Sequence, residues 1–98
     1  MITIPFDKID TKEGIRTFID WLLADVGICY HPDTNFEEYY DDEGNPFFTE
    51  SECMKLNELN EQCIKFCQEK HLIIYIIAMN AIDDYRKRRN LPIIDWLS

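Results

Sequence analysis

The sequence predicts an all-α fold: a small bundle of three main helices with a long acidic and aromatic loop and an apolar C-terminal tail packed back on the bundle. Apolar residues recur at helical spacing in three stretches, and two of these stretches open on capping-box patterns. The 98 residues, 46% of them hydrophobic, suit one core. We therefore expect residues 1–98 to form a single helical domain.

The first helix is expected to begin at Asp10, because Asp10 and Glu13 have the spacing of a capping box. The residues that follow form one apolar stripe at helical spacing, namely Ile15, Phe18, Ile19, Leu22, Leu23 and Val26. Gly27 is expected to end the helix, since glycine tolerates the left-handed conformation found at helix C-termini.

Residues 28–48 are expected to form a long loop, with one helical turn at 36–40. Turn-forming residues gather there, including Pro32, Asp33, Asn35, Gly44, Asn45 and Pro46. A loop longer than about 15 residues in a compact domain is often functional. This loop is therefore the first candidate for a site.

The second helix is expected to begin after Thr49, which forms a capping box with Glu52. Its apolar stripe consists of Leu56, Leu59, Cys63, Phe66 and Cys67. No Gly or Pro fixes its end, which we place near Lys70 or His71.

Residues 72–79 are ambiguous, because β-branched residues also suit a buried strand. An alternative α+β fold would have short strands at 2–6 and 72–78. We prefer a helix, since its spacing continues to Tyr85 and the available partner strands are short and contain or adjoin Pro. The helix should end near Asn90 and Pro92, with the bases of residues 86–89 in its last turn.

The third helix is apolar on nearly every face between Leu72 and Ala81, so it must be covered all round. Either it is the central element of the bundle, or part of it forms a subunit interface. The second alternative predicts a homodimer through residues 72–82, and a third hypothesis for the function is that this homodimer has a structural role without catalysis.

The net charge of −9 is spread unevenly, because ten acidic residues and no Lys or Arg lie between Arg16 and Lys55. Like-charge repulsion disfavours direct binding of nucleic acid or anionic lipid through this region. The electrostatic complement is a basic protein partner. No apolar run approaches the roughly 20 residues that span a bilayer, and no secretory signal is apparent, so we expect a cytoplasmic protein without membrane contact.

The function expected from these observations is that of a protein-interaction module, an inhibitor or regulator that binds a basic partner through residues 36–48. Aromatic side chains would supply contact area, while acidic ones would steer association. The candidate partner-binding residues are Phe36, Glu37, Glu38, Tyr39, Tyr40, Asp41, Asp42, Glu43 and Phe47. The alternative is that these aromatic residues only pin the loop to the core.

A second hypothesis is an enzyme. Glu58-x-x-Glu61 and Asn80-x-x-Asp83 resemble the ExxE and ExxD pattern of all-α nucleoside triphosphate pyrophosphohydrolases, with Asn80 where that family has Glu. The resemblance implies a metal-dependent hydrolase whose carboxylates hold Mg²⁺ against a triphosphate. Helical geometry, however, places Glu58 and Glu61 opposite the apolar stripe of their helix.

Two further metal patterns are weaker. An EF-hand-like register places Asp41, Glu43, Asn45 and Glu52 at ligand positions, but Pro46 stands where the loop requires Gly, so we interpret it as a solvated acidic turn. A zinc or thiol site would use Cys29, His31, Cys63 and Cys67. We instead expect the cysteines to be free, buried thiols, and we assign no catalytic residue, metal or cofactor.

Overall fold

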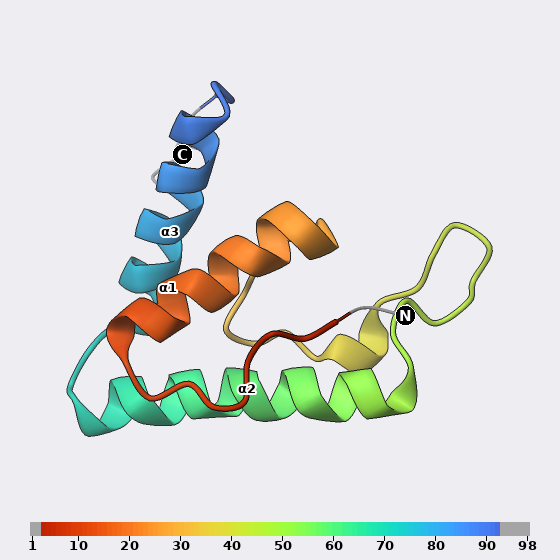
Figure 1. Ribbon diagram of the computed structural model, residues 1–98, viewed down its shortest axis with the longest axis horizontal. Coiled ribbons are helices and arrows are strands. Elements are labelled where there is room, and N and C mark those ends of the chain that lie inside the picture. Colours follow the sequence, from red (N-terminus) through yellow and green to blue (C-terminus); the bar gives the residue numbers. More distant parts are fainter. Residues whose placement is uncertain (1–2, 93–98) are drawn as a thin grey trace.

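The computed structural model describes residues 3–92 and is helical, as the sequence predicts (Figure 1). Helix α1 spans Lys12–Trp21 and continues as a π-helical turn, η1, over Leu22–Val26. A short 3₁₀ turn, η2, covers Phe36–Glu38 within the long loop. Helix α2 spans Glu50–Glu69, and helix α3 spans Ile74–Arg88.

The core lies between α1, α2, α3 and the loop that joins α1 to α2. Helix α2 forms one layer, and α1 lies above it in this view, tilted relative to α2 (Figure 1). The largest fully buried side chains come from α1 with η1, from η2 and from α2, and are Ile15, Phe18, Ile19, Leu22, Phe36, Leu56, Leu59 and Cys63. The N-terminal segment lies along α2, where the Ile9 backbone N–H donates to Gln62 Oε1 at 2.8 Å.

The start of α1 differs by one residue from the sequence prediction. Thr11, not Asp10, is the N-cap, and its hydroxyl oxygen accepts a hydrogen bond from the Gly14 backbone N–H at 2.9 Å. Both residues favour this position, so the sequence alone did not decide between them. Gly27 closes the helical segment as predicted, with φ +87° and its N–H bonded to the Leu22 carbonyl at 2.7 Å.

The capping box of α2 is confirmed. The Thr49 hydroxyl accepts from the Glu52 N–H at 3.2 Å, and the Glu52 carboxylate accepts from the Thr49 N–H at 2.8 Å. The helix ends at Glu69 and is followed by His71 at φ +57°. The predicted end near residue 70 is therefore correct.

The alternative α+β fold is wrong, because residues 74–88 are helical and residues 3–6 pair with no strand. The only β-type contact within residues 3–92 is an isolated bridge between Tyr40 and Pro46. Residues 74–88 form a helix and not a strand because helical spacing brings one set of side chains into the core. These are Ile77, Ala78, Ala81 and Ile82.

Helix α3 is not the central element that one alternative expected. It stands at the edge of the molecule beside α1, and only one of its faces is buried (Figure 1). It ends as predicted, with bases in its last turn and Asn90 at φ +55°. Arg86 Nε donates to the Pro92 carbonyl. The rest of the predicted apolar tail, residues 93–97, lies outside the described residues.

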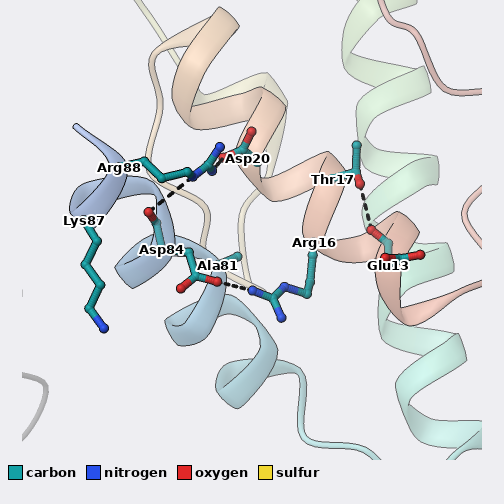
Figure 2. Close-up of a pocket in the computed structure, with 8 residues that line it drawn as sticks. All are labelled: Glu13, Arg16, Thr17, Asp20, Ala81, Asp84, Lys87 and Arg88. Carbon is teal, nitrogen blue, oxygen red and sulfur yellow. Dashed lines mark hydrogen bonds and ion pairs between the residues drawn. The ribbon is translucent and has the colours of Figure 1, made fainter.

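Two ion pairs join α1 to α3 across a charged depression (Figure 2). Arg16 on α1 pairs with Asp84 on α3, and Arg88 on α3 pairs with Asp20 on α1. Partners advance by four residues in the same direction on both helices, so α1 and α3 run in the same general sense where they cross.

Candidate interaction surface

The acidic and aromatic segment over residues 36–48, here called the acidic arm, is anchored to α2 at both ends. Phe36 is fully buried and its backbone N–H donates to Asn57 Oδ1 at 3.0 Å. Phe48 is also buried, and the two rings pack edge to face with centroids 5.8 Å apart. Cys53 Sγ donates to the Phe36 carbonyl at 3.3 Å. The ends of the arm are thus part of the core.

Between these anchors the arm forms a tight hairpin-like loop that projects beyond the first turn of α2 (Figure 1). The Asp41 N–H donates to the Asn45 carbonyl at 2.9 Å, next to the bridge between Tyr40 and Pro46. The Asp41 carboxylate accepts from the backbone N–H groups of Glu43 and Asn45, each at 2.9 Å. Asp41 therefore holds the shape of the tip, and Gly44, at φ +84°, completes the turn.

The aromatic residues of the arm fall into two groups. Phe36 and Phe48 are anchors, and Tyr39 is half-buried against both of their rings. Tyr40 and Phe47, by contrast, are 60% and 45% exposed. The expectation that the aromatic residues only pin the loop therefore describes the first group. In the second group Phe47 also packs on the Phe48 ring, with centroids 5.1 Å apart, but Phe47 and Tyr40 both keep an exposed surface that this role does not require.

Tyr40 and Phe47 line one open groove of about 680 Å³ together with acidic side chains. Glu37 contributes from η2 and Glu50 from the first turn of α2. Glu52 also reaches this groove but is buried and engaged in the capping box. The groove thus combines two exposed rings with two exposed carboxylates.

The structure divides the candidate residues by position. Glu37, Glu38, Asp42 and Glu43 are exposed. Phe36 is inaccessible, so it can position the arm but cannot touch a partner. Sequence reasoning missed Glu50, because it was assigned only to the helix start. The capping box itself was the available signal, since it places residue 50 in the first helical turn directly beside the loop.

The carboxylates of the enzyme hypothesis are not brought together in any described depression. Glu58 and Glu61 are exposed on α2 and line a shallow depression with other residues of that helix. Asn80 and Asp83 lie on α3 and do not line it. Within residues 3–92, no group of three or more His, Cys, Asp or Glu side chains is arranged to hold a metal ion. The EF-hand-like register is explained by the roles of Asp41 in the tip and Glu52 in the cap.

The cysteines of the zinc or thiol hypothesis are dispersed. Cys53, Cys63 and Cys67 are free and buried on α2, whereas Cys29 is exposed, which corrects the expectation that all four are buried. Burial, with a smaller effect from Cys67, raises the pKa of the Cys63 thiol to about 12, so it is protonated and weakly nucleophilic at neutral pH. The His31 ring lies against Tyr75, and its Nδ1 accepts the Asp33 N–H at 3.1 Å.

Within the part of the chain that the structure describes, no helix combines the length and apolar character that a bilayer span requires. Comparison of the chain with models of protein families, with curated proteins and with solved structures gives no match. The groove of the acidic arm is therefore interpreted from its own geometry and charge.

Proposed function

We propose that the protein is an interaction module that binds a basic partner protein through the acidic arm. The observation that carries the proposal is the groove in which the exposed rings of Tyr40 and Phe47 lie beside the carboxylates of Glu37 and Glu50. Two large aromatic side chains left exposed at one place are typical of binding surfaces.

The arm contains buried residues that hold its shape and exposed residues that could contact a partner, and this arrangement supports the proposed function. Buried Phe36 and Phe48 fix the backbone, and the hydrogen bonds of Asp41 fix the tip, so little ordering entropy is lost when a partner binds. The exposed aromatic rings would supply contact area and interact favourably with Lys or Arg side chains. Glu37, Glu38, Asp42, Glu43 and Glu50 would attract a basic surface and raise the association rate.

The test compares partners captured from lysate by the wild-type chain and by the Tyr40→Ala/Phe47→Ala double variant. Basic proteins should bind the wild type and be lost from the variant, since truncating a central aromatic contact weakens affinity about tenfold or more. Leu91→Ala is the control, because Leu91 is 41% exposed and does not line the groove.

A captured partner is then purified and titrated against Glu37→Gln/Glu50→Gln. This variant should slow association and reduce its salt dependence, because it removes steering charges while keeping side-chain size. The proposal fails if wild type and Tyr40→Ala/Phe47→Ala capture the same proteins equally well.

A further inference from the structure

One side of α3 and the turn before it carry an apolar surface that the rest of residues 3–92 covers only in part, with the His31 ring packed against Tyr75. Ile73, Tyr75 and Ile76 are 60%, 47% and 52% exposed, and Leu72 is 37% exposed. These four residues, here called the α3 apolar face, belong to the turn before α3 and to its first turn. Soluble monomers rarely expose apolar side chains in such a contiguous group.

The structure reduces the set of residues within 72–82 that could form an interface with a second chain. Ile77, Ala78, Ala81 and Ile82 are buried within the chain itself, so they cannot contact a partner. What remains is the α3 apolar face at the N-terminal end of the helix. By comparison, Met54 is the one large apolar residue of α2 that is strongly exposed, and it stands alone.

We infer that the α3 apolar face binds a second copy of this chain. No charged residue occurs from Leu72 to Ile82, although the chain carries a net charge of −9. Two copies therefore repel one another over most of their surfaces, but the stretch from Leu72 to Ile82 adds no charge of its own to that repulsion. The carboxylate of Asp33, beside the His31 ring that packs on Tyr75, lies 3.8 Å from His31 Nδ1. The absence of charge also means that this face offers no attraction to a partner selected for basic or acidic character.

Charge at the other end of α3 sets the orientation of the pair. Arg86, Lys87, Arg88 and Arg89 end the helix. A parallel pair would bring both basic ends together, whereas an antiparallel pair related by a two-fold axis keeps them apart and aligns the helix dipoles favourably. The two-fold axis of such a pair passes near the first turn of α3, so Ile76 in that turn lies close to its own copy.

The exposed area indicates a weak dimer. A standard stable interface buries about 800 Å² on each partner. A face built on four side chains that are each 37% to 60% exposed is small by this standard. The dimer should therefore form in a concentration-dependent way, in the micromolar range or above, and it leaves the acidic arm at the opposite side of the molecule free (Figure 1).

Sedimentation velocity of the full chain, from about 1 to 500 µM, tests the inference. The wild type should shift from monomer to dimer, and Ile76→Glu should raise the dissociation constant at least tenfold. Met54→Glu is the matched control, because Met54 is 65% exposed on α2 and should leave dimerisation unchanged. Circular dichroism verifies that each variant is folded.

Disulfide cross-linking locates the contact. In a Cys29→Ser background, which removes the exposed thiol, Ile76→Cys should form a covalent dimer on oxidation and Met54→Cys should not. A wild type that stays monomeric over the whole range overturns the inference, as does an Ile76→Glu variant that dimerises like the wild type. Either result leaves the proposed function of the acidic arm intact, since that function does not depend on dimerisation.

Discussion

The buried polar residue Asn60 joins the loop after α1 to helix α2. It is 5% exposed, and its Oδ1 accepts a hydrogen bond from the hydroxyl of buried Tyr30. Its Nδ2 donates to the Pro32 carbonyl at 3.1 Å. Both ends of the amide are thus satisfied, which a buried polar group requires. Nothing in the sequence marks Asn60, because its burial depends on where the loop crosses α2.

Tyr30→Phe should lower the free energy of unfolding by about 1 to 3 kcal/mol, because it leaves the Asn60 carbonyl oxygen buried without its donor. Urea denaturation monitored by circular dichroism measures the change. The matched control is Tyr75→Phe, in which the hydroxyl is lost from a partly exposed ring. A Tyr30→Phe variant as stable as the wild type would show that the hydroxyl contributes nothing to stability.

At the scale of elements, the crossing of α1 and α3 combines apolar burial with the two ion pairs in Figure 2. The participating side chains are between 36% and 63% exposed, so solvent screens the attraction. We therefore assign most of the stability of this crossing to buried residues such as Ile19, Ala78 and Ile82. The ion pairs mainly fix how the helices are aligned.

A double-mutant cycle with Arg16→Gln and Asp84→Asn should give a coupling free energy of about 0.3 to 1 kcal/mol at low salt. The coupling should largely vanish near 1 M NaCl, where the screening length is about 3 Å. Thermal or urea unfolding at both salt concentrations measures it. A coupling that is unchanged in high salt would mean that the pair is shielded from solvent.

Patterns among neighbouring residues predicted where the helices begin and end. How the helices pack against one another depends on contacts between residues far apart in the sequence. The Thr49 capping box and the Gly27 stop depend on neighbouring residues, so the sequence contained them. The pairing of Arg16 with Asp84 spans 68 positions, and no local pattern predicts it. The charge pattern was likewise sufficient to locate the acidic arm in the sequence. It could not predict that Phe36 is buried and Phe47 exposed, because that difference depends on how the arm packs on α2.

At the scale of the whole molecule, burial in the core keeps several titratable side chains in their protonated form. Cys53, Cys63 and Cys67 lie along α2, and Tyr30 packs over the same region. Burial is the main cause of the raised pKa of each group. The native state therefore retains protons that the unfolded chain releases in alkaline solution, which links the stability of the entire fold to pH.

The free energy of unfolding should therefore fall as pH rises above 9. An unfolded thiol ionises near pKa 9.0, whereas Cys63 in the native state has a pKa of about 12, so its contribution is intact below pH 9 and is lost between pH 9 and about 12. Cys63 alone accounts for a slope approaching about 1.4 kcal/mol per pH unit in this window. Urea denaturation under reducing conditions at pH 7, 8, 9.5 and 10.5, roughly spanning the start of this window, measures it.

Cys63→Ala isolates this residue from the other buried groups. The variant should be less stable overall, because it leaves a small cavity, yet its stability should fall less steeply than that of the wild type above pH 9. Between pH 7 and 8 the difference between the two proteins should stay constant, since neither state of the thiol titrates appreciably there. If the free energy of unfolding fell equally steeply with pH in both proteins above pH 9, the Cys63 thiol would be in contact with solvent in the native protein. It would then not be a core residue.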